Sequence, residues 1–388
     1  MKYLVFVVLL ALVLVAILYG VNTPKLSTVN QIQINDNNQF VLVGDKSKTL
    51  SRAYLKSPYL LVLDEDLNQR EKKVFDTPTT SQNSQVILKG QKSILYNYRA
   101  GNLEHSPEYA YIDFLDENYS KDSLLHFGYR TRLEKVVELP SGLAACSYER
   151  SDRTISLTFL KSNSDKRKYN YKISPESSQP TDMVAVDSDT TLLIISLAGG
   201  YHYRDGHNYD MPKAHSVILK VNAKGEIIKR DSLVGAQNLF VNDLEKSGDR
   251  YLLTGTIQNE NTGMDVLVIE MSDQLDTISC TQTTQAGVQQ GVKSILYKEG
   301  ILTLSQGESP QFSNYICSLT FKDKLGIRKW NQSYGQKGYS YTPTDMVHHN
   351  NKIYITANRR TQREALPEAI LLEIDTTGEL IQEHSLFP

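Results

Sequence analysis

The sequence is poor in cysteine. Three cysteines, Cys146, Cys280 and Cys317, occur in 388 residues. Their odd number and their spacing match neither a disulfide framework nor a zinc site. Since free cysteine is among the most buried residue types, we expect small buried side chains, with a Cys280–Cys317 bridge as the alternative.

Net charge and catalytic motifs are also nearly absent. The 42 Lys and Arg residues offset 44 Asp and Glu residues, which leaves a formal charge of −2. Such a chain has no general attraction to nucleic acid, so no nucleic-acid partner is expected. There is no Gly-rich phosphate loop, no nucleophile elbow and no His-Glu-x-x-His sequence. We therefore assign no catalytic residue, no metal ligand and no cofactor.

One long hydrophobic run is present, at the N-terminus. Residues 3–21 contain no charged residue, and as a helix they would extend roughly 28 Å, close to the hydrocarbon thickness of a bilayer. Lys2 precedes the run, so the positive-inside rule exports the rest of the chain. An uncleaved anchor and a cleaved signal peptide both fit. We expect a single-pass membrane protein with a periplasmic or extracellular domain, or a secreted protein. Residues 1–21 are the anchor or signal, 22–29 a linker and 30–388 one domain.

A repeat with a period of about 50 residues occupies that domain. The pentapeptide Pro-Thr-Asp-Met-Val opens two copies, at residues 180–184 and 343–347. Each copy continues with two apolar strands, a polar tight turn rich in Asp, Asn and Gly, and a more polar fourth strand. The expected second strands are 40–44, 93–96, 143–146, 192–195, 251–255, 301–304 and 353–356. The expected third strands are 59–64, 111–116, 155–159, 217–222, 266–271, 316–321 and 370–375.

Seven four-stranded antiparallel units without helices between them predict an all-β fold, a seven-bladed β-propeller, preceded by the N-terminal hydrophobic helix. Six or eight blades remain open because residues 84–173 are the least regular. The first and last units each look complete, so no strand exchange is expected where the ring closes. The approximate blades are 30–80, 81–130, 131–175, 176–236, 237–287, 288–338 and 339–388.

The stretch 321–378 combines Gly326, Trp330 and Ser333-Tyr334-Gly335 with the strands 353–356 and 371–375 and the turn Thr376-Thr377-Gly378. This pattern resembles the β-propeller repeats of exported bacterial proteins. The resemblance implies a fold and an extracytoplasmic setting but no single activity, because such blades serve many functions. The single tryptophan and the lack of a Trp-Asp dipeptide disfavour better-known propeller families, including those with quinone cofactors.

Three aspartates are candidate ligand-binding residues near the central axis. Asp182, Asp243 and Asp345 fall in innermost strands. A ring of carboxylates would bind a cation or a polar ligand. The alternative is a repeated hydrogen bond that ties each innermost strand to the adjacent blade. Other repeats offer Glu134 or Lys293 at this position, which weakens the idea of a ring.

The longest insertion, between the second and third strands of the fourth unit, is the other candidate site. Its aromatic, basic and acidic residues are typical of interfaces and sugar sites. They are Tyr201, His202, Tyr203, Arg204, Asp205, His207 and Tyr209. A metal site using His202, His207 and Asp205 or Asp210 matches no standard ligand set. A partner-binding loop and a plain solvated insertion both remain open.

From these observations we favour a membrane-anchored propeller that binds or scaffolds a protein, peptide or glycan over an enzyme. The first alternative is a carbohydrate-active hydrolase or lyase, which needs two carboxylates roughly 5–10 Å apart. Its candidates are Asp182, Asp243, Asp345 and Asp205. The second alternative is a structural assembly component, which predicts an exposed apolar patch.

Overall fold

The computed structural model describes sixteen segments of the chain. They are residues 27–47, 56–75, 80–89, 92–100, 109–129, 131–149, 154–161, 166–171, 178–187, 191–198, 215–233, 238–259, 261–284, 287–309, 314–361 and 367–387. Within these segments every regular element is a β-strand. No helix that could span a membrane occurs in them, and the apolar run 3–21 lies outside them.

Consecutive strands pair with one another in antiparallel groups of four. The first group contains β1 (Ser27–Ile34), β2 (Phe40–Ser47), β3 (Lys56–Leu63) and β4 (Gln69–Val74). The second contains β5 (Thr80–Lys89), β6 (Lys92–Ala100), β7 (Tyr109–Leu115) and β8 (Lys121–Tyr129). The third contains β9 (Thr131–Leu139), β10 (Gly142–Glu149), β11 (Thr154–Leu160) and β12 (Lys166–Tyr171). Next come β13 (Ser178–Asp187), β14 (Thr191–Ala198), β15 (His215–Asn222) and β16 (Ile227–Leu233).

The remaining strands continue the pattern. They are β17 (Leu239–Ser247), β18 (Arg250–Asn259), β19 (Gly263–Ser272) and β20 (Thr277–Thr283), then β21 (Gly287–Tyr297), β22 (Gly300–Glu308), β23 (Tyr315–Asp323) and β24 (Arg328–Tyr334), and finally β25 (Tyr339–His349), β26 (Lys352–Thr361), β27 (Glu368–Ile374) and β28 (Leu380–Ser385). A short parallel contact, Gly263 with Gly287 and Met264 with Val288, joins β19 to β21. We number the seven groups of four strands as the first to the seventh sheet, although this contact links the fifth to the sixth.

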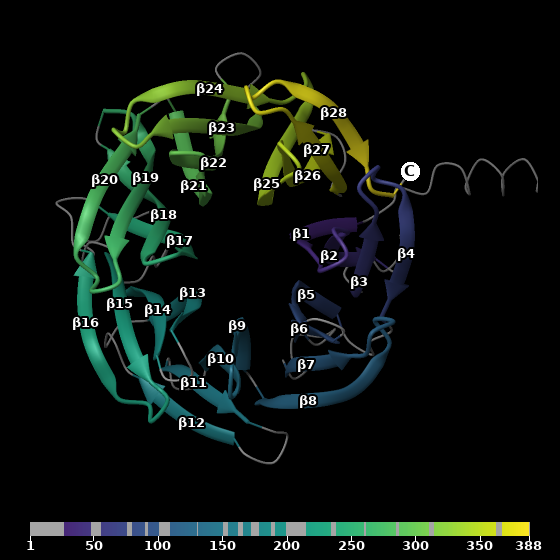
Figure 1. Ribbon diagram of the computed structural model, residues 1–388, viewed down its shortest axis with the longest axis vertical. Coiled ribbons are helices and arrows are strands. Elements are labelled where there is room, and N and C mark those ends of the chain that lie inside the picture. The colour runs from purple at the N-terminus through teal and green to yellow at the C-terminus, as the bar shows by residue number, and fades with distance from the viewer. Residues whose placement is uncertain are drawn as a thin grey trace, which may run out of the picture.

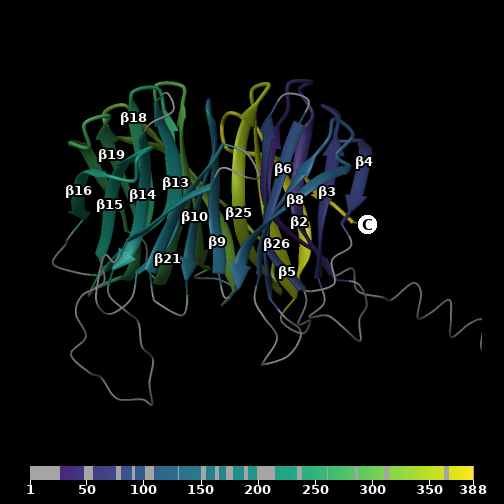
Figure 2. The same cartoon turned by 90° about the horizontal axis from the view of Figure 1, so that it is seen from below.

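The groups are arranged in a ring around a central axis (Figure 1). The first strand of each group lies nearest the axis and the fourth lies on the outer rim. Seen from the side, the strands run between two faces of a flattened body (Figure 2). Because the strands are antiparallel, the turns after first and third strands share one face, which we call the turn face. The connections after second and fourth strands share the opposite face, which we call the loop face.

The burial pattern explains why these segments occupy these positions. β2 and β3 are buried along nearly their whole lengths, whereas β4 is mostly exposed. Strands covered on both faces need continuous apolar runs, and a polar outer strand protects an exposed sheet edge. Each second and third strand expected from the sequence falls almost entirely within an observed strand.

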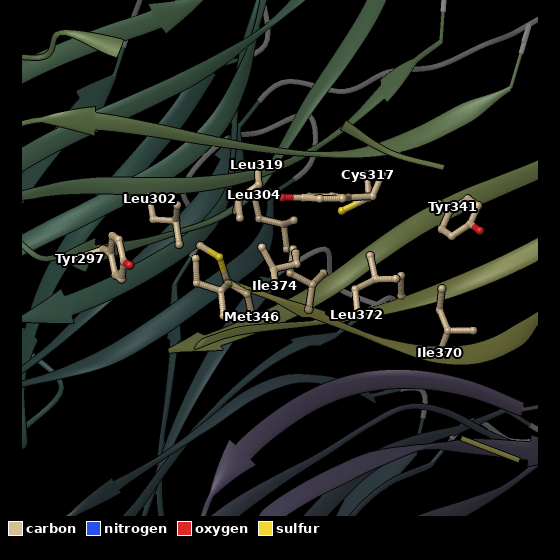
Figure 3. Packing of buried hydrophobic residues seen from close by; sticks show 14 residues of the cluster. Tyr297, Leu302, Leu304, Cys317, Leu319, Tyr341, Met346, Ile370, Leu372 and Ile374 are labelled. Atoms are coloured by element: carbon tan, nitrogen blue, oxygen red, sulfur yellow. The ribbon is translucent and has the colours of Figure 1, made fainter. Parts of the chain in front are cut away.

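Apolar side chains pack between neighbouring sheets rather than in one central core. One cluster joins β21–β24 to β25–β28, where Leu304 and Leu319 face Met346 and Leu372 (Figure 3). Further clusters join the first sheet to the second, the second to the third, the third to the fourth and the fourth to β17–β19. No single sheet covers both of its own apolar faces, so the fold depends on each neighbour.

The ends of the described chain meet where the ring closes. The side-chain amide of Asn358, on β26, accepts a hydrogen bond from the backbone N–H of Val29 (2.8 Å) and donates one to its carbonyl (3.1 Å). Phe387 follows β28 and packs edge-to-face on Tyr59 of β3, with ring centroids 4.7 Å apart. The first and last sheets each consist of four consecutive strands, so closure uses side-chain packing and hydrogen bonds without strand exchange.

Tight turns on the turn face are fixed by side chains of the preceding sheet. Tyr334, at the end of β24, donates a hydrogen bond to the carbonyl of Gly378 in the β27–β28 turn (2.7 Å). A Cβ atom at Gly378 would lie 2.9 Å from the Trp330 ring, and the φ of Gly378 is +90°. Tyr171 makes the same bond to Gly225 between the third and fourth sheets (2.8 Å). At both junctions a tyrosine at the end of the fourth strand therefore joins one sheet to a turn of the next, and at the junction between the sixth and seventh sheets a tryptophan four residues earlier adds to the contact.

The cysteines are free. Cys146 and Cys317 are buried, as the apolar strand patterns predict, and Cys280 is exposed. The alternative of a Cys280–Cys317 bridge is wrong, because both of these cysteines are free.

Candidate functional site

Every innermost strand carries an irregularity in its pairing with the second strand. Most of these are single-residue bulges, which re-aim the residue that follows. The residues that follow them are all polar: Gln31, Gln85, Lys135, Asp182, Asp243, Lys293 and Asp345. We call these seven residues the inner ring. Asp182, Asp243 and Asp345 thus occupy equivalent positions, as the sequence predicts.

One sequence-based assignment to this ring is wrong. Glu134 is the bulged residue of β9, since Leu133 and Lys135 pair with consecutive residues of β10. The inner-ring member of the third sheet is therefore Lys135. β9 lacks the Pro-Thr-Asp-Met-Val sequence, so that sequence does not identify the ring residue in this sheet. The distance from the start of the apolar second strand would have identified Lys135.

Asp182 and Asp345 make the same set of hydrogen bonds. The Oδ2 atom of Asp345 accepts the backbone N–H of Ile32 on the next sheet (3.0 Å), and Oδ1 accepts the N–H of Met346 (2.9 Å). Asp182 accepts the N–H groups of Leu244 (2.9 Å) and Met183 (2.8 Å) with the corresponding atoms. Both carboxylates are buried, at 4% and 7% exposure. They therefore link one innermost strand to the next.

In the first two sheets an uncharged side chain accepts the equivalent backbone N–H of the next sheet. The Gln31 side-chain oxygen accepts the N–H of Val86 on β5 (2.8 Å). In the second sheet Tyr96, rather than the ring member Gln85, accepts the N–H group of the next sheet. Its hydroxyl donates to Gln85 (2.6 Å) and accepts the N–H of Val136. Burial of this hydroxyl raises the pKa of Tyr96 to about 12. The sequence search for carboxylates missed this bond because an amide or a phenol makes it equally well.

The two lysines of the ring form ion pairs with the aspartate of the following sheet. Lys135 lies 2.8 Å from Asp182, and Lys293 lies 2.7 Å from Asp345. Burial opposes the charge of each ammonium group. The neighbouring carboxylates outweigh it, Asp182 at Lys135 and Asp345 at Lys293, so both lysine pKa values are raised. Buried ions are retained when paired and hydrogen-bonded in this way.

Asp243 is the exception. Among the residues that the structure describes, its Oδ2 atom is buried and has no hydrogen-bond partner. Burial first, and then the charge of Asp182, raise the pKa of Asp243, and Lys293 and Lys135 only partly offset them. Burial also raises the pKa of Glu245, whose carboxylate lies 4.0 Å from Lys293. In this part of the ring, the Oδ2 atom of Asp243 therefore has no hydrogen-bond partner among the described residues.

The other sequence-derived candidates lie in the connection between β14 and β15, which is outside the described residues. They are Tyr201, His202, Tyr203, Arg204, Asp205, His207 and Tyr209. His215 begins β15 at the loop face. In the described segments no three His, Cys, Asp or Glu side chains are grouped to hold a metal ion.

No protein-family model and no curated protein sequence matches this chain. Solved structures do. The β-propeller domain of the Trilobed protease from Pyrococcus furiosus has a TM-score of 0.53 and 10% identity, and the match covers 94% of this chain and 96% of that one. A protein from Lactobacillus plantarum has a TM-score of 0.56 and 13% identity, with 94% and 97% covered.

A prolyl endopeptidase structure matches with a TM-score of 0.54 and 13% identity over 94% of this chain and 50% of that one, so the present chain spans half of that enzyme's length. Identities this low reveal the fold alone. The fold is a β-propeller of four-stranded antiparallel sheets.

Proposed function

We propose that the chain is a seven-bladed propeller exported across a bacterial inner membrane and held there by residues 1–21, or released after their removal. The seven groups of four consecutive strands support the blade count. The uncharged run 3–21 supports the export. The blades then follow the approximate ranges derived from the repeat, except that the first blade begins with β1 at Ser27, which shortens the expected linker 22–29 to residues 22–26.

We propose further that the propeller is a binding or scaffolding module for a protein, peptide or glycan. The observation that carries this proposal is that the carboxylates of Asp182 and Asp345 are engaged in contacts within the fold. Each is held by a lysine and by a backbone N–H of the next sheet. A catalytic carboxylate must instead be free to exchange a proton or contact the substrate. Asp182 and Asp345, two of the candidate catalytic acids, therefore join neighbouring blades through these contacts.

The binding surface in this proposal is the loop face. The connection between β14 and β15 is rich in tyrosine and histidine and contains Arg204. Aromatic and arginine side chains carry much of the binding energy at interfaces. We assign partner contacts to Tyr201, Tyr203 and Arg204, with the neighbouring His202, Asp205, His207 and Tyr209.

Affinity capture with residues 22–388, which keep the whole of β1, tests this assignment. Deletion of residues 201–214 should remove a glycan, peptide or protein that the unmodified domain retains. A matched control shortens another polar connection of the loop face, residues 101–108, and should retain the same ligand. Thermal unfolding of both variants checks the fold. An unchanged set of captured ligands in the first variant would remove this loop from the proposal.

A carbohydrate-active enzyme is the second candidate, and only Asp243 favours it. Its raised pKa and uncommitted Oδ2 atom suit a general acid. Release of reducing ends from a glycan by the wild-type domain, lost in Asp243→Asn, would support the enzyme. Binding without turnover in both proteins would support the binding module.

A further inference from the structure

A cavity lies between the third and fourth sheets, away from the inner ring. Its volume is about 120 Å³, and it is bounded by the β9–β10 hairpin, by the facing ends of β11 and β12, and by the β15–β16 turn. Leu139, Leu143 and Phe159 form apolar walls. Three cations line it as well: Lys161, Arg167 and Lys224. None of its lining residues is acidic. We call it the 3/4 pocket. It opens on the turn face, opposite the loop face.

The repeat itself shows how the pocket arises. Leu139 pairs with Gly142 as Tyr297 pairs with Gly300, so Leu139 and Tyr297 occupy equivalent positions. Tyr297 is 1% exposed, and its ring packs edge-to-face on Phe321 at 5.4 Å between centroids. A leucine at this position fills less volume than a tyrosine.

A second replacement changes the chemistry of the same space. Arg167 pairs with Phe159 as Trp330 pairs with Phe321. Trp330 covers the turn glycine Gly378, whereas at the 3/4 junction the ring of Tyr169 covers the corresponding Gly225. Arg167 is therefore not needed to cover the turn, and it brings a charge to the rim of the pocket.

The charges are also specific to this junction. The residue that opens the turn after the third strand has a side-chain oxygen in six sheets: Asp64, Asp116, Asn222, Ser272, Asp323 and Asp375. In the third sheet it is Lys161. Lys224 likewise stands where the last sheet has Thr377. In the described part of the chain, no carboxylate pairs with the side chain of Lys161, Arg167 or Lys224.

We propose that the 3/4 pocket binds a carboxylate attached to a compact apolar group. Arginine binds carboxylates through two parallel hydrogen bonds, and two lysines add charge of the required sign. An apolar cavity of about 150 Å³ holds a benzene ring, so the walls suit a phenyl or branched aliphatic group. Two sources share this chemistry: a free arylalkyl acid and the C-terminal residue of a peptide.

Titration calorimetry with the folded domain tests the proposal. 3-Phenylpropanoate should bind with one site per chain, and 3-phenylpropylamine, which has the opposite charge, should not. The peptide Ala-Ala-Phe distinguishes the sources. Binding tighter than that of the acid, lost on C-terminal amidation, assigns a peptide end, and weaker binding assigns a free acid. Equal binding of acid and amine, or no saturable binding of acid or peptide, overturns the proposal.

Variants of two pocket residues, Leu139 and Arg167, locate the binding. Leu139→Tyr should fill the pocket and Arg167→Gln should remove the main anion contact, and each should weaken 3-phenylpropanoate binding at least about tenfold. If Leu139→Tyr does not fold, as judged by thermal unfolding, Arg167→Trp replaces it. The control Lys324→Gln makes the same change in charge on the sixth sheet and should bind as wild type. Full affinity in the filled and neutralised variants would place the binding elsewhere and overturn the proposal.

Discussion

At the scale of single residues, one position in the repeat has acquired different chemistry in different sheets. Asp182, Asp243 and Asp345 all follow a bulge in an innermost strand. Two of them accept backbone N–H groups of the next sheet and pair with a lysine. Asp243 has an oxygen atom with no partner among the described residues. Equivalent position in the repeat therefore does not imply equivalent role.

The pH dependence of stability should reveal this difference at Asp243. Burial and Asp182 raise its pKa in the folded state above the unfolded value, despite Lys135 and Lys293. Such a group stabilises the fold below its unfolded pKa of about 4, and this contribution is lost as pH rises through the folded pKa. Asp243→Asn should therefore gain stability relative to wild type between acidic and neutral pH.

Urea unfolding of both proteins from pH 4 to pH 8 measures this gain. A difference in unfolding free energy that does not change with pH would show that Asp243 titrates normally.

At the scale of elements, the fold depends on contacts between sheets as well as on strand pairing within each sheet. The inner ring joins innermost strands, and Tyr171 and Tyr334 join outer strands to the turns of the following sheets. The closure relies on similar contacts, made by Asn358 and Phe387. A closed ring needs every junction, so one weak junction affects the whole array.

Phe387→Ala should test the closing junction. Phe387 is 4% exposed, packs on Tyr59 and lies beneath the Lys72 ammonium group, 4.3 Å from the ring centroid. Truncating a buried phenylalanine costs about 3–5 kcal/mol, which should appear as a lower midpoint of chemical unfolding. Val74→Ala, which removes an exposed apolar side chain from β4 (48% exposed), is the control and should change little. Equal stability of the two variants would show that the closure does not depend on Phe387.

At the scale of the whole molecule, the sequence predicted the architecture well because the signal is repeated. Long apolar runs spaced by polar turns identified the second and third strands. The innermost strands were harder, because a bulge shifts their register and their polar residues vary. Glu134 was assigned in place of Lys135 for this reason. Tyr96 and Gln31 were missed because a phenol or an amide can replace the carboxylate.

The 3/4 pocket could not be predicted from periodicity alone. Its origin lies in departures from the repeat, with Leu139 in the place of Tyr297 and Arg167 in the place of Trp330. Such departures become visible only once the strand register aligns the copies. Positions that differ from the repeat, rather than positions that follow it, mark the candidate sites of this propeller.

The central claim is that Asp182 and Asp345 hold the blades together and are not catalytic. Equilibrium unfolding of Asp182→Ala and Asp345→Ala tests it most directly, with the exposed Asp249→Ala as control (Asp249 side chain 88% exposed). Removing one partner of a buried, hydrogen-bonded ion pair costs about 3–5 kcal/mol, so we expect a loss of this size in both variants and none in the control. Residues kept for catalysis commonly lower stability. Unchanged or increased stability in Asp182→Ala and Asp345→Ala would contradict the account.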